Sequence, residues 1–159
     1  MTDVIHEQVA GTVVWVQKAY IYVTVPVNIQ RQLHLDRPRV RSNAHTWGTQ
    51  VAALTTTQRS CLGRVPVTFS LRRIDGLWYA TDLQFDSAVV DSKCRNRFVE
   101  LMGKYNLGVE MTGDKVVITF SDGSTHDFTY NSHNPDRTKD AIRRYAAKNG
   151  TPLPPLQAT

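Results

Sequence analysis

Aromatic and basic side chains gather in a short segment near the N-terminus. Within this segment lie Trp15, Lys18, Tyr20 and Tyr22. Aromatic rings stack on nucleic-acid bases of any kind, at about 1–3 kcal/mol per base, and a nearby lysine can contact a phosphate. We therefore expect these residues to bind RNA or DNA, either single-stranded or structured.

The order of side chains in this segment also predicts where the rings point. Successive side chains of a β-strand face opposite ways, so Lys18, Tyr20 and Tyr22 share one face. Ala19, Ile21 and Val23 make the other face, which we expect to be the core side. The aromatic face then points outward as a stacking platform. The alternative is a set of plain surface or interface aromatics, which strand propensity alone explains.

Two further basic groups are candidate phosphate contacts. Arg37, Arg39 and Arg41 alternate around Pro38 in a stretch that we expect to be a loop, which either clamps phosphates or is simply solvated. In the C-terminal half, a second basic group shares one face of a predicted helix: Arg137, Arg144 and Lys148. This ridge fits a phosphate backbone. The alternative is a helix surface stabilised by ion pairs from Asp136 and Asp140 to neighbouring arginines.

The sequence gives little support for a catalytic site or a metal site. His126 and His133 are the candidates for acid/base work, but no second carboxylate or nucleophile accompanies them at a diagnostic spacing. Cys61 and Cys94 are far apart and belong to no Cys/His cluster, so we expect two reduced, partly buried thiols. We predict no catalytic residue, no metal and no cofactor.

The N-terminal half reads as short strands rich in Val, Ile, Tyr and Thr. We expect one hairpin over 11–15 and 19–26, and a second over 65–73 and 77–85. The polar stretch between the hairpins predicts one strand near 46–53 and otherwise loop. Residues 1–86 are thus predicted to form a five-stranded β-barrel of OB type, a fold whose sheet face and loops bind oligonucleotides.

The C-terminal half changes to helical periodicity. Its first helix, with an N-cap expected at Asp91 or Ser92, buries one stripe: Cys94, Phe98, Leu101, Met102 and Tyr105. Three strands follow, over 108–112, 115–121 and 124–130. A second helix begins at Asn134-Pro135 and ends at Asn149-Gly150. Residues 87–150 therefore predict a small α+β module with both helices on one face of an antiparallel sheet, followed by an unpacked, proline-rich tail at 151–159.

The first predicted hairpin resembles a known family. Residues 11–17 and 18–23 are similar to the first hairpin of cold-shock domains, in which a Gly-x-Val-Lys-Trp-Phe-Asn strand leads into Lys-Gly-Phe-Gly-Phe-Ile. Residues 67–71 and 76–83 look like the family's fourth and closing strands. The resemblance implies that Trp15, Tyr20 and Tyr22 stack on bases and that Lys18 contacts phosphate. His45 and Trp47 are the candidates for the family's second aromatic motif.

Residues 107–150 loosely resemble the double-stranded-RNA-binding fold of the HicA toxin family. The shared features are a glycine before the first strand, an Asp-Gly hairpin and an arginine-rich closing helix. Asp114-Lys115-Val116 stands where that family has its catalytic histidine. The resemblance therefore implies RNA binding without that family's ribonuclease route.

Composition sets the remaining expectations. The chain has 159 residues, of which 41% are hydrophobic and 21% charged, and a net charge of +5, which suits a polyanionic partner. No apolar run approaches the length of a membrane span, and residues 1–8 lack the features of a signal peptide, so we expect a cytoplasmic protein without a membrane partner. The main hypothesis is a non-catalytic protein that binds RNA or DNA. The alternatives are an adaptor or inhibitor that binds a protein partner, and a small ribonuclease or toxin.

Overall fold

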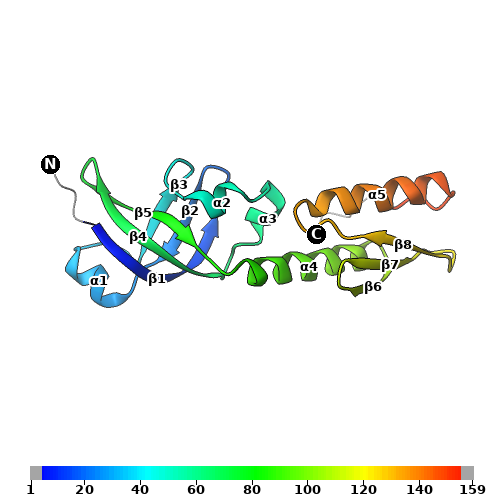
Figure 1. Cartoon of the computed structure of the whole chain (residues 1–159), viewed down its shortest axis with the longest axis horizontal. Helices are drawn as coiled ribbons and strands as arrows, with labels where there is room; N and C mark the ends of the chain where they lie inside the picture. Colours follow the sequence, from blue (N-terminus) through cyan, green and yellow to red (C-terminus); the bar gives the residue numbers. More distant parts are fainter. Residues whose placement is uncertain (1–4, 155–159) are drawn as a thin grey trace. The chain divides into compact units, whose positions relative to one another are not determined.

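The computed structural model describes residues 5–154. They form two compact units, and the contacts divide the described chain between Val90 and Asp91, inside helix α4 (Ser87–Lys104) (Figure 1). The first unit contains a closed five-stranded barrel, and the second contains a three-stranded sheet. The predicted fold class, a five-stranded barrel followed by a small α+β module, is confirmed.

The barrel strands follow one another in the order β1-β2-β3-β5-β4, and β1 pairs with both β2 and β4. The pairing of β3 with β5 is parallel, and the other pairings are antiparallel. This arrangement is compatible with an OB-like barrel. The strands are β1 (Ile5–Val16), β2 (Tyr20–Thr24), β3 (Arg39–Asn43), β4 (Pro66–Ile74) and β5 (Leu77–Gln84).

Alternation of side chains builds the barrel core. Ile21 and Val23 of β2 are fully buried, together with Leu71 of β4. Gly11 allows the close approach of β1 and β2, because a Cβ atom there would clash with the carbonyl oxygen of Thr24. Any side chain at Gly11 would push the two strands apart.

The segment between the hairpins differs from its prediction. The strand expected near 46–53 was wrong, since this range contains α2 (Thr49–Ala52), and the strand lies earlier, at β3. Helix α1 (Val27–Gln32) precedes β3, and α3 (Thr56–Ser60) follows α2. Local capping explains α3: the side chains of Thr55 and Gln58 each accept a hydrogen bond from the other's backbone N–H.

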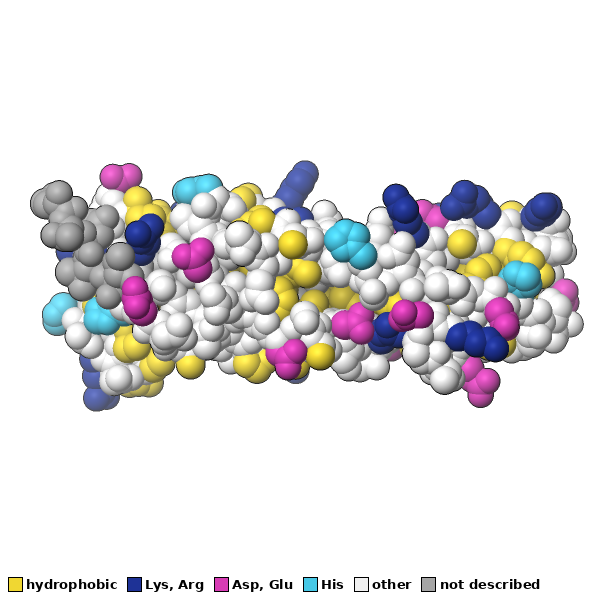
Figure 2. All heavy atoms as spheres, viewed as in Figure 1, with side chains coloured by type: hydrophobic (Ala, Val, Ile, Leu, Met, Phe, Trp, Pro, Cys, Tyr) yellow, Lys and Arg dark blue, Asp and Glu magenta, His cyan; other side chains and the backbone are white. Residues whose placement is uncertain are grey.

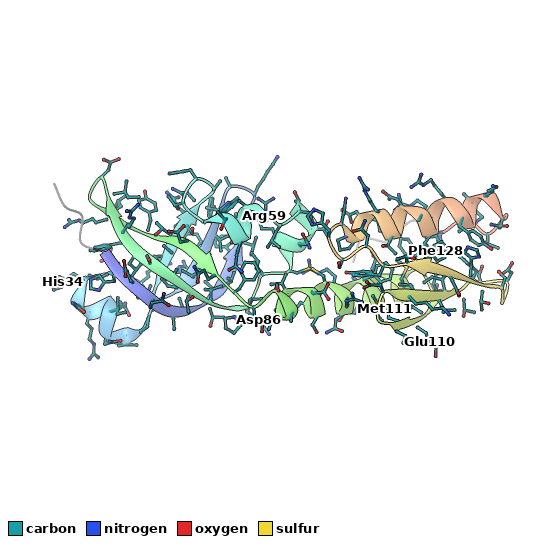
Figure 3. The ribbon with its side chains drawn as sticks, in the orientation of Figure 1. His34, Arg59, Asp86, Glu110, Met111 and Phe128 are labelled. Atoms are coloured by element: carbon teal, nitrogen blue, oxygen red, sulfur yellow. The ribbon has the colours of Figure 1, made fainter. Side chains whose placement is uncertain are left out.

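The second unit packs both of its helices on one face of its sheet, as predicted. Its elements after α4 are β6 (Gly108–Thr112), β7 (Lys115–Thr119), β8 (Thr125–Thr129) and α5 (Pro135–Lys148). Phe98 of α4, Ile118 of β7 and Ile142 of α5 belong to the same buried cluster. Met111 and Phe128 pack against this cluster, whereas Glu110 lies on the opposite face of β6 (Figure 3).

Two boundary predictions in this region were wrong. Helix α4 begins at Ser87 and not after a cap at Asp91 or Ser92; the side chain of Asp86 accepts a hydrogen bond from the backbone N–H of Ala88 at 2.9 Å. The tail predicted to be unpacked makes contacts as far as it is described. The N–H of Thr151 donates to the carbonyl of Ala146 at 2.9 Å, and Leu153 packs against the core. Residues 155–159 of the predicted tail lie outside the described residues.

Cys61 and Cys94 are both buried, with 2% and 4% of their surface exposed, which is deeper than the partial burial expected from the sequence. Between residues 5 and 154, no helix combines the length and the apolar character needed to cross a bilayer.

Candidate nucleic-acid interface

A β-bulge turns Trp15 outward. The register of β1 against β2 shifts between Val13 and Trp15, so that Val14 and Trp15 are both about half exposed although they are consecutive in the strand. Uninterrupted alternation would have put Trp15 on the same side as Val13, which is fully buried. The bulge instead places Trp15 opposite Tyr22, with the two rings stacked at a centroid distance of 5.9 Å.

Strand β2 presents its tyrosines on this outer surface. Tyr20 and Tyr22 are half-buried, and their rings meet edge to face at 5.5 Å. The predicted outward direction of the two tyrosines is therefore confirmed, as is the burial of Ile21 and Val23. The expectation for Ala19 was wrong: it lies exposed in the turn before β2, so the inward alternation begins only at Ile21.

Strand β3 adds arginines to the same surface. Arg41 is the cross-strand partner of Tyr22, and Arg39 is the partner of Thr24. The guanidinium carbon of Arg39 lies 5.2 Å from the ring centre of Tyr22, and that of Arg41 lies 5.4 Å from the ring centre of Tyr20. These two arginines were expected in a loop, which was wrong. The strand gives them fixed positions over the rings.

Strand β5 completes the surface with Tyr79, whose ring centre lies 5.9 Å from the guanidinium carbon of Arg41. We call the whole surface the aromatic–arginine face, and its members are Trp15, Tyr20, Tyr22, Arg39, Arg41 and Tyr79. Among the described residues, neither arginine of this face makes an ion pair. Both guanidinium groups therefore keep their charge available for an anionic ligand.

Two predicted residues lie beside the face. Lys18 is exposed in the tight turn between β1 and β2, where the N–H of Gln17 donates to the carbonyl of Tyr20 at 2.9 Å. Arg37 is exposed ahead of β3 and lines a pocket of about 600 Å³ together with Arg39 and Arg41. The structure thus brings all seven predicted residues of the N-terminal half to one side of the barrel or to its margin.

Sequence reasoning missed Tyr79 and its neighbour Trp78, which also lines this pocket. Both residues follow the turn at Asp75-Gly76, and this turn is recognisable from the sequence. Their closeness to Arg41 depends on the parallel pairing of β3 with β5, in which Arg41 lies opposite Tyr79. This pairing joins segments that are far apart in the chain, and no local sequence pattern predicts it.

Trp47 does not belong to the face. Its side chain is only 5% exposed, and the guanidinium carbon of Arg59 lies 4.9 Å from its ring centre. The candidate second aromatic motif at His45 and Trp47 therefore does not provide a second stacking surface.

The basic ridge of the second unit lies on α5. Its members Arg137, Arg144 and Lys148 are all exposed, and Lys and Arg side chains gather over α5 in Figure 2. The buried stripe occupies the other side of the helix, where Thr138, Ile142 and Ala146 are buried. The ion pairs found among residues 5–154 do not include any member of the ridge.

The two candidate histidines of the second unit have different surroundings. His126 stacks on Tyr145, with ring centres 4.1 Å apart, and His133 is exposed. Within residues 5–154, no group of three or more His, Cys, Asp or Glu side chains is placed to hold a metal ion.

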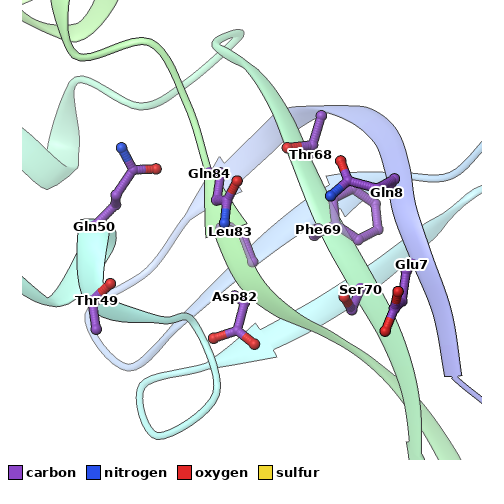
Figure 4. Close-up of a pocket in the computed structure, with 10 residues that line it drawn as sticks. All are labelled: Glu7, Gln8, Thr49, Gln50, Thr68, Phe69, Ser70, Asp82, Leu83 and Gln84. Carbon is purple, nitrogen blue, oxygen red and sulfur yellow. The ribbon is translucent and has the colours of Figure 1, made fainter.

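A second pocket of the barrel, of about 340 Å³, has the opposite character. Glu7 of β1, Ser70 of β4 and Asp82 of β5 line it, and none of the ten described lining residues is Lys or Arg (Figure 4). Its carboxylates repel phosphate groups. Of these two surfaces, only the aromatic–arginine face has the charge that suits a polyanion.

No protein-family model matches this sequence, and neither the curated proteins nor the solved structures include a significant match to the chain. What defines the molecule is therefore its own architecture: a closed five-stranded barrel with an aromatic–arginine face, followed by a small α+β unit with a basic helix.

Proposed function

We propose that this protein is a non-catalytic nucleic-acid-binding protein that holds single-stranded RNA or DNA on the aromatic–arginine face. The observation that carries the proposal is the alternation of rings and cations on one surface, with Arg39 over Tyr22 and Arg41 over Tyr20. The rings stack on bases, and the guanidinium groups contact phosphates or stack themselves.

The position of the face supports the same ligand. In OB-type barrels the surface of strands two and three, with the adjoining loops, binds oligonucleotides. Here β2 and β3 supply two tyrosines and two arginines of the face. The resemblance of the first hairpin to cold-shock domains agrees with this assignment, since it gives the stacking role to Trp15, Tyr20 and Tyr22.

The second unit has a supporting role in this proposal. The exposed ridge of Arg137, Arg144 and Lys148 contacts phosphates and raises affinity without reading bases. The loose resemblance of residues 107–150 to an RNA-binding fold of the HicA family agrees with such a role. The ligand in this proposal is RNA or DNA of the cytoplasm.

Fluorescence anisotropy with a labelled oligonucleotide of about 12 nucleotides tests the proposal, because an OB fold covers roughly 4–16 nucleotides. The triple variant Trp15→Ala/Tyr20→Ala/Tyr22→Ala should lose about 3 kcal/mol or more of binding free energy, which is more than a hundredfold in Kd. The matched control is Val14→Ala/Val27→Ala, which removes two exposed apolar side chains from the same unit. Undiminished binding by the triple variant would refute the proposal.

Binding to a protein partner, as an adaptor or inhibitor, is the second candidate. Tyr, Trp and Arg are also preferred at protein interfaces, and the exposed Val14 lies beside Trp15 in β1. A protein that fails to bind any oligonucleotide, but retains one stoichiometric protein partner from nuclease-treated lysate, would favour this function over the first.

A further inference from the structure

The pocket beside the aromatic–arginine face has the composition of a base-binding site. Its volume of about 600 Å³ lies within the roughly 300–1,000 Å³ of small-molecule sites. Three aromatic residues, Tyr22, Trp78 and Tyr79, are among those that line it. Proteins that read single-stranded sequence place an unstacked base against such rings and form hydrogen bonds with its edge.

Polar groups of both kinds reach this pocket. Arg37, Arg39 and Arg41 line it as hydrogen-bond donors, and Asp36 is the one carboxylate among its described lining residues. In residues 5–154, the side chain of Asp36 takes part in none of the ion pairs, which are Arg95 to Asp91, Arg95 to Asp114 and Lys115 to Asp127. Its two oxygens are therefore available to a ligand.

A carboxylate in this position works against general phosphate binding. It stands next to Arg37 in the chain and offsets part of the positive charge that attracts a nucleic-acid strand. Its chemistry suits a different partner, namely two adjacent N–H groups on one edge of a base. Guanine alone among the common bases presents such a pair, N1–H and the N2 amino group, whereas adenine, cytosine and uracil or thymine present one donor position on that edge.

We propose that this pocket receives one base of the bound strand and that Asp36 selects guanine by accepting hydrogen bonds from N1–H and N2–H. This inference rests on the proposed function, since it needs a strand on the aromatic–arginine face. A bidentate, charge-assisted pair discriminates against the wrong base by an amount that corresponds to about tenfold or more in affinity.

Anisotropy measurements on the full chain test the inference with three labelled strands: oligothymidine, the same strand with one central guanine, and the same strand with inosine at that position. The wild-type protein should bind the guanine strand about tenfold more tightly than oligothymidine. Inosine keeps O6, N7 and N1–H but lacks the N2 amino group, so it should lose most of this preference.

Asp36→Asn should abolish the guanine preference, because the amide has only one acceptor oxygen and cannot accept from both N–H groups. Binding to oligothymidine should stay equal or strengthen, because a negative charge is removed. Asp75→Asn is the matched control: it makes the same charge change at an exposed turn residue that is not among the residues lining the pocket, and should keep the preference. Asn also tolerates the positive φ of 50° at this position.

The outcomes separate the two claims. If the wild-type protein binds oligothymidine and the guanine strand equally, or prefers another base, the guanine inference fails and the proposed function stands. If Asp36→Asn keeps the guanine preference, Asp36 is not the reading group and the inference also fails. If no strand binds at all, the proposed function itself fails.

Discussion

The indole ring of Trp15 stacks on the phenol ring of Tyr22, with 5.9 Å between ring centres and 23° between planes. The two residues are cross-strand partners in β1 and β2, and a bulge in β1 makes this pairing possible on the outer surface. Trp15 nevertheless remains 48% exposed. A large ring that is held in place and still open to solvent suits stacking with a base, which is the role that we propose for it.

Removal of this ring should affect binding much more than stability. Trp15→Ala should weaken binding of a single strand by about 1–3 kcal/mol, the contribution of one stacked base. The free energy of unfolding should change by about 1 kcal/mol or less, because the side chain is half exposed and loses only its pair contact. Anisotropy and urea denaturation measure the two effects. Val14→Ala, equally exposed in the same bulge, is the control, and equal losses in both variants would contradict a specific role for the indole.

Variants of Arg39 and Arg41 should distinguish the contribution of the planar guanidinium group to affinity from the contribution of its charge. Arg39→Lys/Arg41→Lys keeps both charges but removes the planar groups that stack on tyrosine rings, so affinity should fall by about 0.5–1 kcal/mol per position with an unchanged salt dependence. Replacement of both by Ala should in addition reduce the slope of log K against log salt, by about 0.7 per lost phosphate contact.

The control for these arginine variants is Arg31→Ala/Lys104→Ala, which removes the same amount of charge at exposed positions outside the face. If this control lowers affinity and salt slope as much as the Ala pair at Arg39 and Arg41, binding depends on net charge and not on the face.

The ridge on α5 should act on phosphates alone. Arg137→Ala/Arg144→Ala/Lys148→Ala should weaken binding of every strand by a similar factor and lower the salt slope, without change in base preference. The same titrations with strands of different sequence measure this. Affinity and salt slope both equal to those of the wild-type protein would show that the second unit does not take part in binding.

Ser42 should be replaceable with a gain in stability. Its side chain is fully buried in β3, and its hydroxyl has no hydrogen-bond partner among the described residues. Ser42→Ala should therefore raise the free energy of unfolding by about 1 kcal/mol, since a buried unpaired hydroxyl is costly. Thr81→Val is the contrasting variant: Thr81 is also buried, but its hydroxyl donates to the carbonyl of Ser70 at 3.3 Å. Its loss should destabilise, and urea midpoints compare the two.

Arg95 should be the residue whose polar contacts contribute most to holding the β6–β7 turn against α4. It forms an ion pair with Asp91 at 2.7 Å, contacts Asp114 and the carbonyl of Gly113, and lies 4.6 Å from the ring centre of Tyr130. Arg95→Met should lower the free energy of unfolding by about 1–2 kcal/mol, because charge-assisted hydrogen bonds are lost at a partly exposed site. Amide hydrogen exchange at residues 113–115 should accelerate, and unchanged exchange there would contradict this role.

The pH dependence of the Arg95 contribution follows from its pKa. Burial lowers the pKa of the Arg95 guanidinium, but the hydrogen bonds to Asp114 and Asp91, together with the negative charges of both carboxylates, outweigh burial and raise the pKa above its ordinary value. A raised pKa gives stability that is fully present below the ordinary value and is lost only as the pH rises through the folded-state pKa. The loss of stability in Arg95→Met, measured by urea denaturation, should therefore be the same at pH 7 and pH 9.

Much of the fold could be predicted because its signals are local. Helical spacing from Cys94 to Tyr105 predicted the buried stripe of α4, and Asn134-Pro135 marked the start of α5. The segment from Arg39 to Thr56 resisted prediction for two reasons. Val40 is the single apolar residue of β3, so this strand lacks the apolar alternation that usually marks a strand. The short helices around Val51 depend on caps and on packing, neither of which gives a periodic pattern.

The sequence by itself determined that rings alternate with small aliphatic residues in β2, and that arginines alternate with other residues from Arg37 to Arg41. These patterns depend only on neighbouring residues. Because successive side chains of a strand point to opposite faces, each pattern predicts which residues share a face. Only the tertiary structure decided that the faces coincide. The bulge at Val14 turns Trp15 outward, and the closure of the barrel sets β3 between β2 and β5, so that Arg41 meets both Tyr20 and Tyr79. Register shifts and barrel closure arise from contacts between distant segments, which local residue patterns do not record.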